Sequence, residues 1–268
     1  MSQYETILAE TPLESVRLVK LNRPRQLNAY STRMCEELCK EIDDYLKDDA
    51  LRVLVLTGEG RGFCAGGDVS NADEDRHDLM KQQLSHGREM RDGMHRVIQA
   101  LHHLDKPLIA AINGPAVAGG LALALACDFR IADEDARLGD TSGRFALLPD
   151  EGGAWLFPRA MGLDRALKMT MLAETYPARE AQALGLVTEV VASGEALNQS
   201  LDLAQRIAAQ SPLAVRLAKG MMTASMDMTL EQSQREAALA VMVANPSKDV
   251  AEGVRAFFKK ETPVFTGH

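Results

Sequence analysis

The chain has 268 residues, 46% of them hydrophobic and 25% charged, which is ordinary usage for a globular protein with a substantial core. Its 38 acidic residues outnumber its 30 basic ones, and the net charge of −8 at pH 7 argues against nucleic-acid and anionic-membrane partners. The longest apolar stretches, such as Leu121 to Cys127, fall far short of the ~20 residues that a bilayer span requires. The first ten residues lack the pattern of a targeting signal, so we expect none there.

Strands alternate with helices in the first half of the chain. The expected elements, in order, are a strand at Glu14 to Leu21, an amphipathic helix at about Ser31 to Lys47, strands at Leu51 to Thr57 and Pro107 to Asn113, a short apolar helix at Gly119 to Cys127, and a strand at Phe129 to Ala132. These strands are apolar without polar alternation, so we expect a parallel sheet covered on both faces, in an α/β layer fold.

The character of the sequence changes at about Asn198, where strand signals end. The helical patterns that follow are Leu201 to Gln210, Pro212 to Met226, Leu230 to Ala244 and Lys248 to Lys259. We therefore expect a core over residues 1–197 and a helical region over residues 198–268, which packs on the core or on a neighbouring subunit. A polar stretch, Asn71 to His86, is expected to flank the active site.

The four cysteines, Cys35, Cys39, Cys64 and Cys127, lie in apolar surroundings and show no C-x-x-C spacing. Cys35 and Cys39 are one helical turn apart, which would also suit paired metal ligands, but the same helix carries a core-facing apolar surface. The pattern predicts buried structural thiols, no metal site, and a reducing, cytoplasmic compartment.

Two glycine-rich segments, Gly60 to Asp68 and Asn113 to Gly120, each follow an expected strand and open a helix. Glycine lets a ligand approach the backbone closely, and a helix start leaves N–H groups unpaired. Two such turns on adjacent strands would aim two N–H groups at one oxygen, as in an oxyanion hole, although each alone also fits a simple tight turn. Neither segment has a phosphate-loop or dinucleotide pattern, which disfavours nucleotide-dependent catalysis.

An ordered set of segments extends over nearly the whole chain. They are LNRP and QLNA within residues 21–29, GFCAGGD at 62–68, INGPAVAGG at 112–120, LPDEGG at 148–153, ALGLV at 183–187, and Glu252-Gly253 through Phe257. In this order and spacing the chain resembles the enoyl-CoA hydratase/isomerase (crotonase) superfamily. The resemblance implies a spiral of ββα units with a C-terminal helical region that builds trimers or hexamers. It also implies an acyl-CoA thioester as substrate, with no cofactor besides the coenzyme A that the substrate carries.

The resemblance also assigns site residues by position. It places the oxyanion N–H groups on Gly67 and Gly119. Phe257 and Lys260 match C-terminal positions that approach the CoA of the same or a neighbouring subunit, where a basic group suits a phosphate. The residues that match the path of the CoA adenine and pantetheine are Arg25, Gln26, Leu27, Ala65, Gly66 and Asp68. For Arg25 and Lys260, ordinary solvated surface charge is an equal alternative.

The chain departs from the family pattern at the two glutamates with which hydratases activate water, because those positions hold Ala122 and Ser142. Instead, Asp150 and Glu151 stand directly before two glycines. A carboxylate near an apolar pocket has a raised pKa, and one carboxylate suffices to move a double bond. We expect enoyl-CoA double-bond isomerisation, with Glu151 favoured over Asp150 because of its longer reach. Water addition and non-catalytic acyl-CoA binding are the alternatives, and acids at a helix start also serve as caps.

Overall fold

The computed structural model describes residues 4–68 and 85–268, and most of the polar stretch expected to flank the active site lies outside these ranges. The elements of the α/β core, in chain order, are β1 (Ile7–Leu13), β2 (Val16–Leu21), the short 3₁₀ helix η1 (Pro24–Gln26), α1 (Thr32–Lys47), β3 (Val53–Gly58), α3 (Ser85–Asp92), α4 (Met94–His103), β4 (Leu108–Ile112), β5 (Ala116–Val117), α5 (Gly119–Leu125), β6 (Phe129–Asp133), β7 (Arg137–Gly139), η2 (Ser142–Phe145), α6 (Gly153–Met161), α7 (Leu163–Met171), β8 (Thr175–Pro177), α8 (Ala178–Ala183) and β9 (Glu189–Val191). The helices α9 (Ala196–Ala208), α10 (Pro212–Ser225), α11 (Leu230–Ala244) and α12 (Lys248–Lys259) follow.

The main sheet has the order β1-β2-β3-β4-β6-β9. The strands from β2 to β9 pair in parallel, as the apolar runs predicted. The edge strand β1 pairs antiparallel with β2 and was not predicted, because Glu10, Thr11 and Pro12 interrupt its apolar residues. The parallel arrangement brings the carboxyl ends of β3 and β4, and the loops that follow them, to one edge of the sheet.

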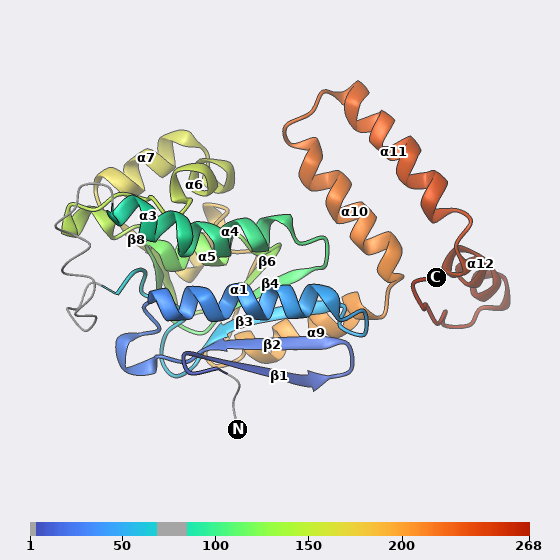
Figure 1. The fold of residues 1–268 in the computed structure, drawn as a ribbon, viewed down its shortest axis with the longest axis horizontal. Helices are drawn as coiled ribbons and strands as arrows, with labels where there is room; N and C mark the ends of the chain where they lie inside the picture. Colours follow the sequence, from blue (N-terminus) through green and yellow to red (C-terminus); the bar gives the residue numbers. More distant parts are fainter. Residues whose placement is uncertain (1–3, 69–84) are drawn as a thin grey trace.

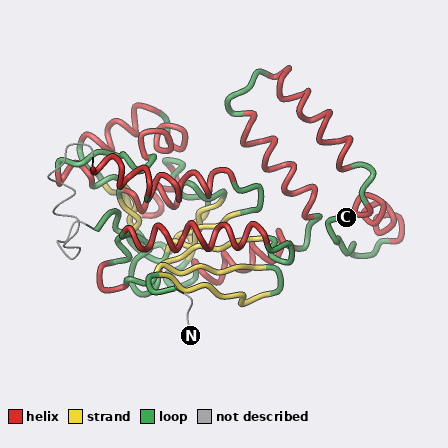
Figure 2. Tube along the Cα trace, viewed as in Figure 1, coloured by secondary structure: helices red, strands yellow, loops and turns green. Residues whose placement is uncertain are grey.

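Both faces of this sheet are covered, which confirms the prediction from the unbroken apolar strands (Figure 2). Successive residues of a strand point to opposite faces. Leu54 and Leu56 of β3 therefore join the larger core, which includes residues of α1, α4 and α5. Val53 and Val55 join a smaller core on the other face, where α9 packs.

A second, three-stranded sheet has the order β5-β7-β8. The chain passes from β4 in the main sheet to β5 in the small sheet and then into α5, and it repeats this course from β6 through β7 into the following helices. Isolated bridges between Cys64 and Ala116 and between Tyr30 and Gly67 continue the small sheet toward the glycine-rich segments. The fold is thus the ββα spiral expected from the sequence.

The C-terminal helices divide into two groups. The helix α9, which the predicted boundary at residue 197 assigned to the C-terminal region, packs on β3, β4 and β6 as part of the core. By contrast, α10 and α11 project from the core as an antiparallel pair (Figure 1), and every residue in them remains at least partly exposed. Two ion pairs fasten the base of α10 to the core, Arg216 to Asp105 at 2.7 Å and Lys219 to Asp128 at 2.8 Å.

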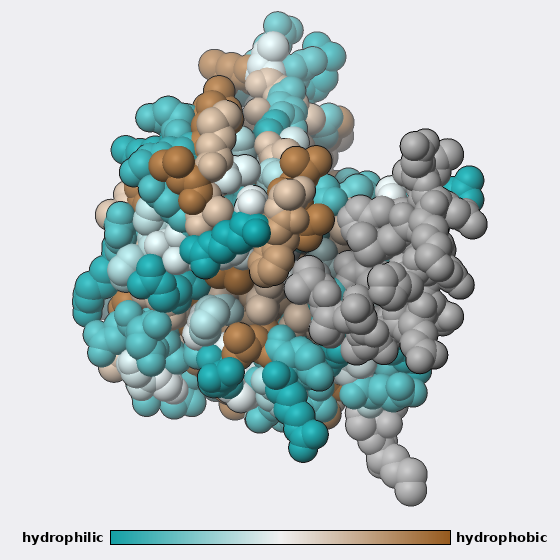
Figure 3. All heavy atoms as spheres, turned by 90° about the vertical axis from the view of Figure 1, so that its left-hand side faces the viewer, coloured by the Kyte–Doolittle hydropathy of each residue, from teal (hydrophilic) through white to brown (hydrophobic). Residues whose placement is uncertain are grey.

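The four cysteines are free and buried, as predicted, and burial raises the pKa of Cys64 and of Cys127 to about 12. Apolar side chains also gather on the surface: Figure 3 faces the end of the molecule that carries α7, and its upper half shows a band of them. Leu163, Met171 and Leu172 in and beside α7 are more than half exposed. Within the described part of the chain, we find no helix with the length and apolar character needed to cross a membrane.

Candidate active site

The loop after β3 and the loop after β4 run side by side. Pro115 O accepts a hydrogen bond from Cys64 N at 3.0 Å, and Cys64 O accepts one from Val117 N at 3.1 Å. The Asn113 side chain spans the same gap by donating to Gly58 O at 2.8 Å. The two glycine-rich segments, which are far apart in the sequence, therefore form one hydrogen-bonded unit.

Gly66 and Gly119 lie where the backbone of these loops is closely surrounded by other atoms. At Gly66, where φ is +90°, a Cβ atom would lie 3.0 Å from Ala118 Cβ and 3.5 Å from Gly119 N. At Gly119 a Cβ atom would lie 2.5 Å from Glu151 Oε1 and 2.7 Å from Tyr30 Cε1. A side chain is excluded at both positions, so the backbone stays accessible to a ligand atom.

The backbone amides of Gly67 and Gly119 are the two that the sequence predicted for an oxyanion hole. Gly66 O accepts from Tyr30 N and Tyr30 O accepts from Asp68 N, so the Gly67 amide between them faces away from Tyr30 in this parallel bridge. Gly119 opens α5, where the first N–H groups have no acceptor within the helix. Across residues 4–68 and 85–268, neither amide donates a hydrogen bond.

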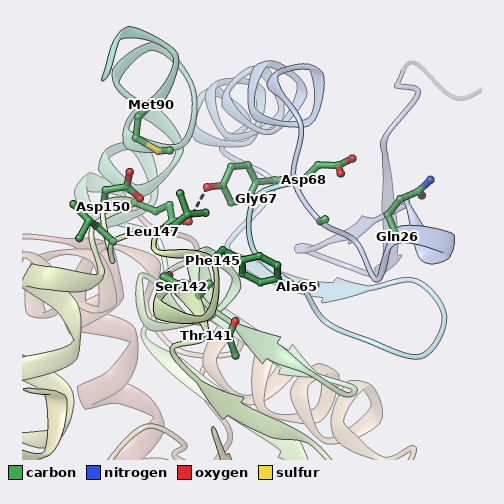
Figure 4. A pocket seen from close by; sticks show the side chains of 15 residues that line it. Gln26, Ala65, Gly67, Asp68, Met90, Thr141, Ser142, Phe145, Leu147 and Asp150 are labelled. Atoms are coloured by element: carbon green, nitrogen blue, oxygen red, sulfur yellow. Dashed lines mark hydrogen bonds between the residues drawn. The ribbon is translucent and has the colours of Figure 1, made fainter. Parts of the chain in front are cut away.

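The carboxylate of Glu151 lies beside Gly119 and is held by Tyr30. The Tyr30 hydroxyl donates to Glu151 Oε1 at 2.8 Å, the bond drawn as a dashed line in Figure 4. Only 6% of Glu151 is exposed, and this burial raises the pKa of its carboxyl above the usual value. The bond from Tyr30 opposes the rise, whereas the negative charges of Asp150 and Asp140 add to it. A carboxyl with such a pKa is suited to taking up and returning a proton.

A cavity of about 350 Å³ opens onto these groups. Its lining residues are Gln26, Ala29, Tyr30, Ala65, Gly67, Asp68, Met90, Ala118, Thr141, Ser142, Phe145, Leu147, Leu148, Asp150 and Glu151. In Figure 4, Met90 and Asp150 lie on one side of the cavity and Gln26 and Asp68 on the other. The lining is mostly apolar, with a few polar groups that converge on one place, as is typical of small-molecule sites.

Comparison with known proteins gives the family of the chain. The model of the family described as enoyl-CoA hydratase/isomerase matches residues 12–268. The 2,3-dehydroadipyl-CoA hydratase of Escherichia coli (strain K12) is 34% identical over 254 residues, which cover 95% of this chain and 96% of that protein. The 1,2-epoxyphenylacetyl-CoA isomerase of the same strain is 32% identical, with the same coverage of 95% and 96%. An enoyl-CoA hydratase structure from Bacillus anthracis matches with a TM-score of 0.92 at 33% identity, over 98% of this chain and 100% of that one.

The chain belongs to the enoyl-CoA hydratase/isomerase family. Membership confirms the α/β spiral with its C-terminal helical region, and it makes the protein an enzyme that processes acyl-CoA thioesters. The relatives leave the reaction open, because a hydratase and an isomerase match this chain to nearly the same extent.

Six of the twelve residues predicted for the site line the cavity. Those that line it are Gln26, Ala65, Gly67, Asp68, Asp150 and Glu151. Asp68 is held there by an ion pair with Arg23 at 2.7 Å. Arg25 is exposed on η1 next to Gln26, and Leu27 packs beside Gly62 behind the lining.

The two predicted C-terminal CoA contacts lie elsewhere in the protomer. Phe257 is 78% exposed on α12, and Lys260 follows directly at the exposed end of that helix. Figure 1 shows α12 at the opposite end of the molecule from α3 and α7. Within one protomer these residues do not reach the cavity, so their approach to the CoA of a neighbouring subunit stays a prediction.

The departure from the hydratase pattern is visible in the structure. Ala122 is fully buried in α5. Ser142 lines the cavity, but its N–H donates to Asp140 Oδ1 at 3.0 Å and its side chain has no carboxylate. Among the described residues, the carboxylates that line the cavity are those of Asp68, Asp150 and Glu151.

For Glu151, the alternative of a mere helix cap does not fit the geometry. Gly152 is the N-cap of α6 and makes no side-chain cap hydrogen bond. The Glu151 carboxylate bonds to Tyr30 instead, whereas the backbone carbonyl of Asp150 pairs with His95 Nε2 at 2.6 Å. The two acids therefore occupy different environments, and Glu151 is the one beside the glycine amides.

Sequence reasoning missed Tyr30 and His95. Tyr30 follows the matched segment that ends at Ala29 and precedes Ser31, the N-cap of α1. That position just before a helix could have drawn attention to an aromatic hydroxyl, but nothing local indicates that it meets Glu151 from so far along the chain. His95 lies in an ordinary amphipathic pattern, and its contact with Asp150 depends on how α4 packs.

Proposed function

We propose that the enzyme moves a carbon–carbon double bond in an enoyl-CoA thioester, with Glu151 as its single acid–base group. The observation that carries this proposal is the position of the Glu151 carboxylate. It is buried, bonded to Tyr30 at 2.8 Å, and so near Gly119 that a Cβ there would lie 2.5 Å from Oε1. A base in this place adjoins the amide that would hold the thioester oxygen.

The proton balance needs no second reactant. The thioester oxygen of a β,γ-enoyl group accepts hydrogen bonds from the N–H groups of Gly67 and Gly119. Glu151 removes a proton from the α-carbon, and the electron pair spreads as a dienolate onto that oxygen, where the two amides stabilise the charge. The carboxyl then returns the proton to the γ-carbon, which leaves an α,β double bond.

We further propose that the CoA moiety runs along the Gln26 and Asp68 side of the cavity, with Ala65 and Gly66 beside the pantetheine arm. Gln26, Ala65 and Asp68 line that wall, and Arg25 is exposed next to it. A guanidinium there supplies the positive charge that a phosphate group requires. Arg25→Gln should weaken the binding of CoA thioesters while leaving kcat nearly unchanged.

The decisive experiment offers β,γ-enoyl-CoA and α,β-enoyl-CoA to the purified enzyme. Migration into conjugation increases the absorbance of the first substrate, and water addition decreases that of the second. Because one general acid–base group contributes roughly 10²–10⁴-fold, Glu151→Gln should lower isomerisation about a thousandfold, whereas Asp150→Asn should retain most of it.

Water addition is the second candidate reaction, because Asp150 lies in the same cavity as Glu151 and the pair could hold a water molecule. Consumption of α,β-enoyl-CoA, with equal losses in Glu151→Gln and Asp150→Asn, would favour the hydratase. Binding of CoA thioesters without any α-proton exchange in deuterated water would instead identify a non-catalytic relative.

We also propose that the enzyme forms a homotrimer or a dimer of trimers through its C-terminal helices, and that it works in the cytoplasm. Large apolar side chains on these helices face outward, with Met242 72% and Phe258 78% exposed. Apolar surface of this extent is typical of an interface. Light scattering should give a trimer or hexamer mass for the wild type and a smaller mass for Met242→Glu.

A further inference from the structure

A second cavity, of about 390 Å³, also borders Glu151. We call it the α4–α6 groove, because its walls are His95, Ile98, Gln99 and His102 of α4 and Trp155 and Leu156 of α6. Glu151 belongs to the lining of both cavities. An acyl group whose reacting carbons lie beside this carboxylate is therefore within reach of the groove.

The groove changes character along its length. Ile98 and Leu156 are buried and form an apolar floor. His95, Gln99 and His102 stand on one face of α4, since residues three and four apart in a helix share a face. His102 lies about two turns beyond His95, a rise of ~10 Å along the helix. An apolar middle and a polar far end suit an acyl chain that ends in a polar group.

Basic side chains gather at that far end, although the chain as a whole carries a charge of −8. His102 lines the groove, His103 follows it, and the Arg159 guanidinium lies 3.8 Å from the centre of the Trp155 ring. The Asp227 carboxylate lies 3.5 Å from Arg159 and partly offsets this positive charge. Burial lowers the pKa of His102, and the positive charges of His103, Lys219 and Arg159 lower it further. Such surroundings favour a bound anion.

Trp155 is poorly placed to stack on an aromatic acyl group. Arg159 already occupies one face of its ring, and His102 meets the same ring edge-on, with 5.0 Å between the ring centres. The indole therefore fixes the histidine and the guanidinium at the end of the groove. This arrangement favours a terminal carboxylate over a terminal aromatic ring.

We propose that the α4–α6 groove binds the far end of the acyl group and selects thioesters of dicarboxylic acids, whose terminal carboxylate accepts a hydrogen bond from His102. The proposal rests on the proposed function, because it takes Gly67, Gly119 and Glu151 as the place of the thioester and its reacting carbons. It adds the substrate class.

The test compares two saturated ligands that undergo no reaction, octanedioyl-CoA and octanoyl-CoA, by calorimetric titration. A hydrogen bond to a charged group is worth roughly 1.5–3 kcal/mol, so the wild type should bind octanedioyl-CoA at least about tenfold more tightly. In His102→Phe, which keeps a ring against Trp155, the ratio of the two affinities should fall toward one. The matched control is His103→Phe, since His103 is exposed and outside the groove lining; it contributes charge but no hydrogen bond, so the ratio should fall much less than in His102→Phe.

Equal affinities of the wild type for both ligands would overturn the proposal, as would an equal change of the ratio in both histidine variants. If His102→Phe fails to fold, Gln99→Leu replaces it, because Gln99 is an exposed residue of the groove lining. The ratio of the two affinities should then change, and an unchanged ratio would also count against the groove. Failure of the proposed function has a different signature. It appears as absent double-bond migration with β,γ-octenedioyl-CoA, while the saturated ligands still report on the groove alone.

Discussion

The glycine-rich loops and the α10–α11 pair place their residues in opposite environments. Around the loops, backbone hydrogen bonds and close packing leave no room even for a methyl group at Gly119. In α10 and α11 every residue is at least partly exposed, and nothing lies within 4 Å of the place where a Cβ on Gly220 would stand. The two glycine amides and Glu151 thus come from one protomer, whereas the projecting helices offer their apolar surface outward.

The difference shows where a small substitution should matter. In the loops the backbone itself is the functional group, so a change of one methyl group alters the chemistry directly. In the projecting helices the side chains supply a surface, so the same change should alter only local helix stability. Substitutions of matched size in the two regions therefore test the comparison.

Gly119→Ala should have the largest effect. Its Cβ would meet Glu151 Oε1 at 2.5 Å and Tyr30 Cε1 at 2.7 Å, so the base, the tyrosine or the amide must move. Loss of one oxyanion-hole donor alone costs roughly 10²–10³ in kcat, and displacement of the base adds to it. We expect kcat for isomerisation to fall at least about a thousandfold. A variant that keeps a tenth of the wild-type kcat would show that Gly119 does not border the reacting atoms.

Tyr30→Phe should have the next largest effect. It removes the bond to Glu151, which opposes the rise in the pKa of that carboxyl. The base must be ionised to act, so the acid limb of the kcat/KM profile should move to higher pH, and kcat should fall about tenfold. Tyr176→Phe is the matched control, since Tyr176 donates to Glu174 at 2.7 Å outside the cavity lining. A shift of the acid limb in both variants, or in neither, would contradict the positioning role of Tyr30.

The order of these elements and the place of the glycine amides follow from the sequence, because apolar runs and glycine clusters are local signals. The helix predicted from Ser31 begins there in the structure, with Ser31 as the N-cap of α1. The strand β3 is buried on both faces, as its unbroken apolar run indicates. The partners of Glu151 could not be predicted in this way. Tyr30 meets it from 121 positions away, and His102 reaches the groove only through the packing of α4 on α6. Such contacts depend on tertiary packing that no single segment encodes.

Glu151→Gln should raise thermal stability moderately while it removes activity. Burial raises the pKa of Glu151 in the folded state above its unfolded value, so the folded state binds the proton more tightly. Protonation of Glu151 therefore stabilises the fold fully at a pH below the pKa of the unfolded state. This stabilisation is lost as the pH rises through the pKa of the folded state. At neutral pH the neutral amide removes this cost, and the Tm should rise by about 2–4 °C. The gain should shrink in acid.

The control for this change is Glu41→Gln. Glu41 is also buried, but it pairs with Arg17 at 2.5 Å, so removal of its charge should lower the Tm. A lower Tm in Glu151→Gln at neutral pH would show that the ionised carboxylate stabilises the fold. It would contradict the view that burial raises the pKa of Glu151.

Gly220→Ala should have the smallest effect, and it tests the projecting helices with the same added methyl group that Gly119→Ala adds to the loops. Alanine is favoured over glycine in a helix interior by about 1 kcal/mol, and an added Cβ at this position of α10 meets no atom within 4 Å. The free energy of unfolding should rise by roughly 0.5–1 kcal/mol, with kcat unchanged. Chemical denaturation and the isomerase assay measure the two quantities. A fall in stability would mean that a neighbouring subunit packs directly on this face of α10, so that the contrast between the two regions would hold for the protomer but not for the assembly.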